Sequence, residues 1–246
     1  NYKNMILKRN LVLLLLIMSI GFGAYSQSRV NESFNSGWNF FLGDDSAAKL
    51  PDFNDSRWRK LNLPHDWSIE GEFDIGNPAK PEGGGLPTGI AWYRKSFVLP
   101  KIFQKKNVYI EFDGVYKNSE VWINGHWLGK RPYGYISFRY ELTKYLKPGR
   151  NVIAVRVDNS AQPDSRWYSG SGIYRNVWLT GTGKLAIDHW GTIVTTPKIS
   201  KTTAQVNIKT RIRSGKRLNE KIDLQSQVYD ANGNLAATIR TNDVLL

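Results

Sequence analysis

The chain has 246 residues, no Cys and only 2 Met, and its formal net charge at neutral pH is +13. Hydrophobic residues make up 41% and aromatic residues 13% of the sequence, which supplies a sizeable core and excludes a disordered protein. Basic residues alternate with apolar ones, as in Lys209, Arg211 and Arg213, which is typical of a solvated sheet face and argues against a nucleic-acid partner.

Residues 1–26 are predicted to be a secretory signal peptide. Basic residues precede an apolar run over 11–20, which is shorter than the roughly 20 residues needed to span a bilayer. Ala24 and Ser26 then fit the small-x-small pattern of a cleavage site, so the mature protein is expected to begin near Gln27. An uncleaved membrane anchor is the alternative. The first interpretation predicts a periplasmic or secreted protein with no membrane segment after cleavage.

The region from residue 29 to 183 is dominated by a period of two and is expected to form the first folded domain. Short runs rich in β-branched and aromatic residues, separated by Gly, Pro, Asn and Asp, predict strands. These runs are Ala91–Leu99, Val108–Phe112, Glu120–Ile123, Asn151–Val157 and Asn176–Leu179. Strands do not alternate with helices, so we expect an all-β fold of two packed antiparallel sheets, a jelly-roll sandwich of the galactose-binding type.

Two turns in this region are predicted from residue type. Asn124-Gly125 lies between apolar-aromatic runs, which is the strong signature of a type I′ hairpin. Pro148-Gly149 forms a turn before the strand at 151–157. Ile153, Val155 and Val157 should lie on one face of that strand, with Ala154 on the other.

Residues 184–246 have a different composition, with fewer aromatic residues. Strands are expected at Ala204–Arg213, Ile222–Tyr229 and Leu235–Ile239, the last two joined by a turn at 230–233. This meander is typical of an immunoglobulin-like sandwich, but 63 residues hold only about half of the roughly 100 that such a sandwich needs. We therefore expect an incomplete immunoglobulin-like domain, with one apolar face uncovered.

The segment from Arg166 to Trp178, RWYSGSGIYRNVW, has a composition suited to binding a saccharide. Aromatic faces stack on the apolar face of a sugar ring, guanidinium groups donate to hydroxyls, and Gly170 and Gly172 allow a tight bend. In the alternative interpretation Ile173, Val177 and Trp178 are simply core residues of the next strand. A core role fits Arg166 and Trp167 less well, because they lie in the turn-rich part of the segment.

Six segments in order resemble the N-terminal sugar-binding domain of glycoside hydrolase family 2, most closely its exported β-galactosidases. They are FNSGWNFFLGD, LPHDW, PTGIAWYRKSF, FDGVYKNSEVWINGHWLG, YGYISFRYELT and SRWYSGSGIYRNVWL. The resemblance starts at Phe34 and continues into the family's immunoglobulin-like second domain. The motifs are specific for the family and far less specific for the sugar.

The resemblance implies retaining hydrolysis by two glutamates about 5–5.5 Å apart, on a (β/α)8 barrel that follows these two domains. No segment of this sequence matches that barrel, so no catalytic residue is expected here, and no cofactor or metal is implied. In the family, loops of the first domain reach the bound sugar. The best local matches are Asn77, Asp164 and Arg166, together with the neighbouring Trp167; Ser165 competes with Asp164 for the acidic position.

Two acidic segments offer weaker candidates for chemistry. Asn219-Glu220 resembles the family's acid/base motif, but we interpret it as an exposed connection between strands. Glu70, Glu72 and Asp74 could form a metal site, although solvated loop carboxylates explain them as well. His65 beside Asp66 is interpreted as a residue that fixes a turn.

Two functions remain open from the sequence. The first is the N-terminal portion of a secreted β-galactosidase-like enzyme that binds a β-galactoside-like carbohydrate. The second is a free-standing carbohydrate-binding sandwich. The half-finished second domain favours the first. The sequence does not indicate an oligomeric state.

Overall fold

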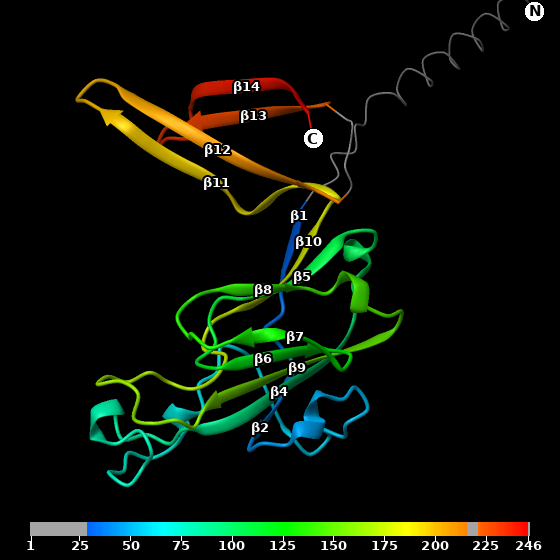
Figure 1. The fold of residues 1–246 in the computed structure, drawn as a ribbon, viewed down its shortest axis with the longest axis vertical. Helices are drawn as coiled ribbons and strands as arrows, with labels where there is room; N and C mark the ends of the chain where they lie inside the picture. Colours follow the sequence, from blue (N-terminus) through cyan, green and yellow to red (C-terminus); the bar gives the residue numbers. More distant parts are fainter. Residues whose placement is uncertain (1–28, 216–220, 246) are drawn as a thin grey trace, which may run out of the picture.

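The computed structural model describes residues 29–215 and 221–245, which are almost entirely β-strands joined by loops and short 3-10 turns (Figure 1). The predicted signal peptide at 1–26 and the Asn219-Glu220 pair lie outside the described residues. No helix within the described ranges is long and apolar enough to cross a membrane.

A sandwich of two antiparallel sheets forms the larger part of the molecule. One sheet has six strands in the order β3-β2-β4-β9-β6-β7, and the other has four in the order β1-β10-β5-β8. The strands are β1 (Arg29–Ser33), β2 (Trp38–Leu42), β3 (Arg59–Leu61), β4 (Gly89–Val98), β5 (Asn107–Phe112), β6 (Ser119–Ile123), β7 (His126–Arg131), β8 (Phe138–Glu141), β9 (Arg150–Asn159) and β10 (Val177–Thr182). The 3-10 turns are η1 (Ser46–Lys49), η2 (Ser68–Glu70), η3 (Pro81–Gly83), η4 (Lys101–Phe103) and η5 (Thr143–Tyr145). The predicted all-β sandwich is confirmed.

The core lies between the two sheets and follows from the alternation along each strand. Ile153, Val155 and Val157 of β9 are fully buried on the inner face, as predicted, and Ile110 of β5 and Leu179 of β10 face them from the other sheet. Ile173 and Val177 also belong to this core, so the structural interpretation of those two residues is confirmed. Trp178 is half-buried and its indole N–H donates to Asp113 at 2.9 Å.

The outer face of the six-stranded sheet is covered by the segment 44–58, held by a buried cation. Arg94 of β4 is fully buried; its Nε donates to Asp55 Oδ2 at 2.8 Å. Its Nη atoms donate to the backbone carbonyl oxygens of Ala48, Leu50 and Phe53. A planar guanidinium can make all these bonds at once, and they attach an irregular loop to the sheet.

The predicted turns are present. Asn124 and Gly125 both have positive φ, 50° and 83°, and join β6 to β7 as a two-residue hairpin. The side chain of Asn124 also bonds Asn151, with Nδ2 donating to Oδ1 at 2.8 Å, which ties the hairpin to β9. Gly149 has a φ of 75° immediately before β9.

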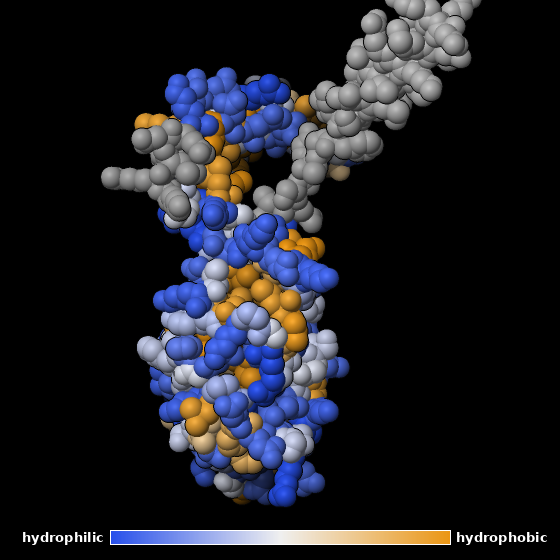
Figure 2. Space-filling model, turned by 90° about the vertical axis from the view of Figure 1, so that its right-hand side faces the viewer, coloured by the Kyte–Doolittle hydropathy of each residue, from blue (hydrophilic) through white to orange (hydrophobic). Residues whose placement is uncertain are grey.

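Two antiparallel hairpins follow the sandwich. They are β11 (Leu185–Ile199) with β12 (Ala204–Ser214), and β13 (Lys221–Tyr229) with β14 (Leu235–Leu245). The long strand β11 was not predicted, because a bulge between Ile187 and Thr192 breaks its alternation. Apolar side chains from the hairpins line a shallow hollow between them, and these residues include Ile187, Val194 and Val228. Figure 2 shows apolar residues in this upper part beneath a hydrophilic outer surface.

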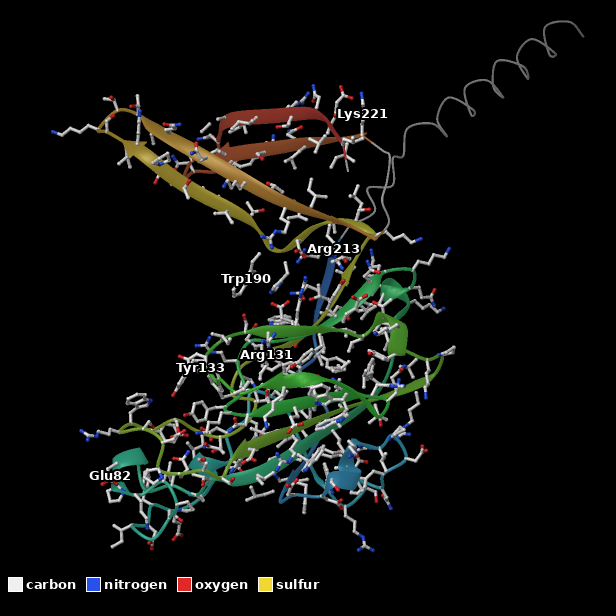
Figure 3. All side chains as sticks on the ribbon, in the orientation of Figure 1. Glu82, Arg131, Tyr133, Trp190, Arg213 and Lys221 are labelled. Carbon is white, nitrogen blue, oxygen red and sulfur yellow. The ribbon has the colours of Figure 1, made fainter. Side chains whose placement is uncertain are left out.

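Charged side chains join the β11–β12 hairpin to the sandwich. Arg213 of β12, expected on a solvated face, instead reaches the junction between this hairpin and the sandwich, where Figure 3 labels it. The Arg213 and Arg139 guanidinium groups lie 5.0 and 4.6 Å from the ring centroid of Tyr109. Both approach the Asp188 carboxylate, Arg139 at 3.1 Å and Arg213 at 3.9 Å. The expectation for Arg213 was wrong because this end of β12 lies beside the sandwich, where the Arg213 side chain contacts Tyr109 and Asp188.

Replacing Arg94 by Met should lower the free energy of unfolding by about 3–5 kcal/mol, because a partly buried carboxylate and three backbone carbonyl groups lose their donor. Urea denaturation followed by Trp fluorescence measures the change. Arg57→Met is the matched control, since Arg57 is exposed and should change stability by less than about 0.5 kcal/mol. Equal small losses in both variants would contradict the assigned role of Arg94.

Candidate functional site

The loops that carry the candidate residues meet at one end of the sandwich. The first residue of β4, Gly89, pairs with the last residue of β9, Asn159, so the loop before β4 and the loop after β9 leave the sheet side by side. Figure 1 shows these loops, residues 64–88 and 160–176, together at the left of the sandwich. We call this region the loop end. Loops on a rigid scaffold are where binding residues are most often found.

Asp66 joins the two loops. Its Oδ1 accepts from the backbone N–H of Ser68 at 2.9 Å and from that of Ser171 at 2.8 Å. Its Oδ2 accepts from the Tyr168 hydroxyl. One carboxylate therefore determines the path of a segment more than 100 residues away along the chain.

A second, buried network fixes the same crossing. The Ser68 hydroxyl donates to Ser171 Oγ at 2.7 Å, and Asn159 Nδ2 donates to Ser171 Oγ at 2.8 Å and to the Gly170 carbonyl at 2.9 Å. Gly170 and Gly172 have φ values of 70° and 130°, so the predicted glycine bend is present. A side chain at Gly172 would also collide with the His65 carbonyl oxygen.

His65 lies in a chain of polar contacts beneath the loop end. Its Nδ1 is 2.7 Å from the Tyr93 hydroxyl and its Nε2 is 2.8 Å from Arg59 Nη2. Arg59 also donates to both oxygens of Glu70. Desolvation lowers the pKa of His65, although Glu70 acts against it, so the ring is neutral at pH 7. Arg59 then donates to Nε2, the proton resides on Nδ1, and the turn-fixing role expected of His65 agrees with this geometry.

Asn77 holds its own loop together. Its Nδ2 donates to the carbonyl oxygens of Glu72 and Gly85, both at 2.9 Å. That loop lies against the loop after β9, since a Cβ on Gly84 would be 3.6 Å from the Tyr168 ring. The structure thus brings the Asn77 loop to the loop end, with the Asn77 Nδ2 atom bonded inside the loop.

Asp164 is bonded to the strand-connecting segment before β6. Its Oδ2 accepts from the Tyr116 hydroxyl at 3.0 Å and from the Lys117 ammonium. Burial would raise the pKa of Asp164, but these donors outweigh it and lower that pKa. The Asp164 side chain is 20% exposed, so it is available to a ligand only at its edge.

Arg166 and Trp167 are the outermost of the predicted residues. Both are exposed, and Trp167 is 60% exposed while its indole N–H donates to the Tyr135 hydroxyl at 3.2 Å. The Tyr135 ring packs against Tyr133 and Tyr116, at centroid distances of 5.6 and 5.2 Å. Exposed aromatic faces beside a guanidinium group form a surface that can stack on a sugar ring and donate to its hydroxyls.

A cleft continues from this aromatic group toward the β11–β12 hairpin. It has a volume of about 790 Å³, and Tyr135, Tyr174, Arg175, Asp113 and Trp190 are among the residues that line it. This size and this mixture of aromatic and polar side chains are typical of a small-molecule site. No group of three or more His, Asp or Glu residues in the described ranges is arranged to hold a metal ion.

Tyr168 lies in the segment 166–178 that was predicted from its composition, whereas Asp66 and Tyr135 were not predicted as parts of this site. Each acts through a partner far away in the sequence, and Asp66 was interpreted only as part of a turn. The LPHDW segment was the available signal, because an Asp directly before a buried Trp is a costly choice unless its carboxylate is bonded.

Comparison with known protein families identifies the sandwich. Residues 25–183 match the family model described as "Glycosyl hydrolases family 2, sugar binding domain". The chain belongs to glycosyl hydrolase family 2. The resemblance stated from its motifs is thereby confirmed.

Relatives in the family are much longer than this chain. The β-galactosidase BoGH2A of Bacteroides ovatus is 52% identical over 215 residues, covering 87% of this chain and 25% of that protein. A β-glucuronidase of Formosa agariphila is 32% identical, covering 88% and 24%. A solved β-glycosidase from Bacteroides vulgatus is 45% identical with a TM-score of 0.82, covering 86% of this chain and 27% of that one. The chain thus spans about a quarter of the family members it matches.

Asp66→Ala should lower the free energy of unfolding by about 1–3 kcal/mol, because two backbone N–H groups and one hydroxyl lose their acceptor. Amide hydrogen exchange should quicken at 168–172 and remain slow in β4 and β9. Asp74→Ala is the matched control, since Asp74 lies on an exposed loop and, among the described residues, its side chain bonds only the nearby Gly76 N–H. Uniform exchange changes across the sandwich would contradict a local role.

Acid should weaken the fold through His65. The pKa of His65 in the folded state lies below its ordinary value of 6.5. The contribution of His65 to the free energy of unfolding is therefore complete above about pH 6.5 and is lost as the pH falls through the folded pKa. His65→Gln should reduce the fall in Tm measured between pH 7.5 and 5.5. An equally steep fall in the variant would show that other groups, such as His189, whose pKa is also lowered by desolvation, cause it.

Proposed function

We propose that this chain is the sugar-binding portion of an exported β-galactosidase-like enzyme, and that hydrolysis depends on residues outside this sequence. The observation that supports this proposal is the loop end, where exposed Trp167 donates to the Tyr135 hydroxyl and its chain neighbour Arg166 is also exposed. The lining of the neighbouring cleft can contact both faces and hydroxyls of a sugar.

The candidate side chains have two kinds of role in this proposal. Arg166 and Trp167 contact the sugar directly, the guanidinium group by donating to hydroxyls and the indole by stacking. Asp164 accepts from a hydroxyl at its exposed edge. Asn77 and Asp66 act as positioning residues, because their hydrogen bonds hold the two loops.

The specificity for a β-galactoside is proposed from the similarity to family members, which include both β-galactosidases and β-glucuronidases. The relative with 52% identity is a β-galactosidase, which supports that choice. Export is proposed from the signal-peptide pattern at residues 1–26 alone.

Titration of the purified chain with galactose and with glucuronate tests the binding role. Trp167→Ala and Arg166→Ala should each weaken binding of galactose about tenfold, since each removes one contact of roughly 1.4 kcal/mol. Trp127→Ala is the control, because Trp127 is exposed to a similar extent, 57%, at the far edge of the six-stranded sheet. Unchanged affinity in both loop variants would refute the site.

An assay with nitrophenyl β-galactoside and β-glucuronide tests the dependence on residues elsewhere. The wild-type chain should release no nitrophenol above the buffer rate, because a retaining mechanism needs two closely spaced carboxyl groups on rigid supports. Turnover by the purified chain that a loop variant abolishes would instead place the chemistry within these residues.

A further inference from the structure

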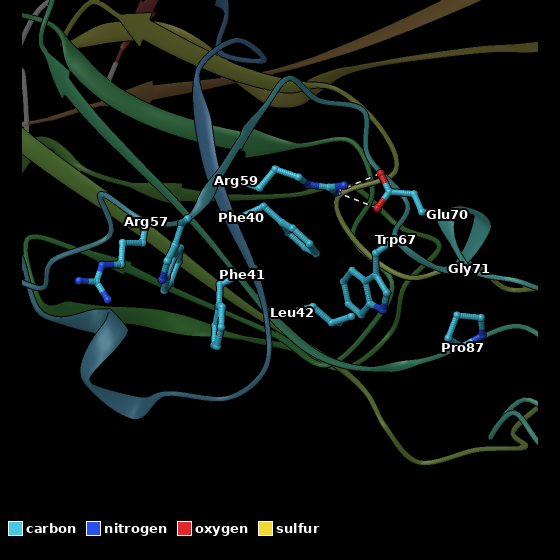
Figure 4. Close-up of a pocket in the computed structure, with 10 residues that line it drawn as sticks. Phe40, Phe41, Leu42, Arg57, Arg59, Trp67, Glu70, Gly71 and Pro87 are labelled. Atoms are coloured by element: carbon cyan, nitrogen blue, oxygen red, sulfur yellow. Dashed lines mark hydrogen bonds and ion pairs between the residues drawn. The ribbon is translucent and has the colours of Figure 1, made fainter.

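A second groove lies at the edge of the six-stranded sheet, on a surface that the loop-end cleft does not share. Strand β3 pairs only with Trp38–Phe40 of β2, so the last two residues of β2, Phe41 and Leu42, have no strand beside them on that side. The open space there has a volume of about 540 Å³ (Figure 4). None of the residues that line it lines the loop-end cleft.

An aromatic pair forms one wall of this groove. The rings of Phe41 and Trp58 stack at a centroid distance of 5.3 Å and an interplanar angle of 21°. Phe41 is 38% exposed and Leu42 is 52% exposed. Buried Phe40 and Trp67 lie at the base of the groove and Pro87 lies across it.

Charged groups border the apolar surface. At one end Arg59 donates to both Glu70 oxygens, and at the other end Arg57 is exposed, as Figure 4 shows. The Arg59 contacts to Glu70 and His65 all use Nη2, so within the described residues its Nη1 and Nε have no hydrogen-bond partner. Burial would raise the pKa of Glu70, but the hydrogen bonds that its carboxylate accepts from Arg59 lead the interactions that lower this pKa, so Glu70 remains charged.

This combination favours one class of ligand. A stacked aromatic wall fits the apolar face of a pyranose ring, and a paired guanidinium and carboxylate can donate to one hydroxyl and accept from its neighbour. A lipid or an apolar peptide would remove water from the Arg59–Glu70 ion pair and offer it no hydrogen bond in return, which costs free energy. The volume is within the range of sites for small ligands.

We propose that this groove is a second saccharide-binding site, in which Phe41 stacks on a pyranose ring and the Arg59–Glu70 pair bonds its hydroxyls. Arg57 adds a positive charge at the far end, so a sugar acid binds there more tightly than the corresponding neutral sugar. The proposal does not depend on the function assigned to the loop end.

Chemical-shift mapping of the isotopically labelled chain separates the two sites. Titration with lactose and with glucuronate should shift the backbone amides of residues 40–42, 57–59 and 70–71, and these shifts yield a Kd for the groove. Phe41→Ala should raise that Kd about tenfold for both ligands, and Arg57→Ala should raise it for glucuronate but not for lactose. Glu70→Gln is the second test of the polar pair, should Phe41→Ala prove unstable.

Two controls make the result specific. Trp127→Ala removes an exposed aromatic residue at the opposite edge of the same sheet and should leave the Kd unchanged. Arg166→Ala should change shifts at the loop end and not at the groove, so failure of one site leaves the other interpretable. The proposal is overturned if neither sugar shifts the groove amides, or if sedimentation shows a dimer that Phe41→Ala converts to a monomer.

Discussion

The antiparallel pairing of β4 with β9 is the constraint on which the rest of the structure depends. Ten residues of β4, from Gly89 to Val98, pair in unbroken register with Arg150–Asn159. This register directs Tyr93 into the core and Arg94 to the outer face. A slip by one residue would exchange the two faces and bury the wrong side chains. The same pairing ends at Gly89 and Asn159, and this end is where the loops meet.

Each face of that strand pair serves a different part of the molecule. The inner face packs against β5 and β10 and makes the sandwich rigid. On the outer face Trp92 stacks on Trp122, and its indole N–H donates to Asp44 at 2.9 Å. Arg156 of β9 binds the same Asp44 carboxylate at 2.7 Å. The covering segment 44–58 is therefore fixed, and it carries Trp58 to the second groove.

Alternation and turn chemistry were enough to predict the sandwich, because these signals are local. Asn124-Gly125 specifies its hairpin through backbone angles that few other residues adopt, and β9 shows its two faces in its own sequence. The site was only partly predictable. Trp167 and Arg166 were indicated by composition, whereas Asp66 acts through hydrogen bonds to Ser171, 105 residues away. A contact between residues so far apart in the sequence produces no periodic pattern.

The junction with the second unit shows the same limit and has a physical consequence for the cleft. Trp190 has a φ of 51° inside the bulge of β11, a conformation that costs of order 1–3 kcal/mol for a bulky residue and persists only when its surroundings enforce it. Beside it, the Asp188 carboxylate accepts from the His189 backbone N–H at 2.8 Å and binds Arg139 of the sandwich at 3.1 Å. Trp190 is 75% exposed and lines the cleft opposite Tyr135 and Tyr174. Because Arg139 belongs to the sandwich and Asp188 to the hairpin, this ion pair attaches the bulge that carries Trp190, and with it one part of the cleft lining, to the sandwich.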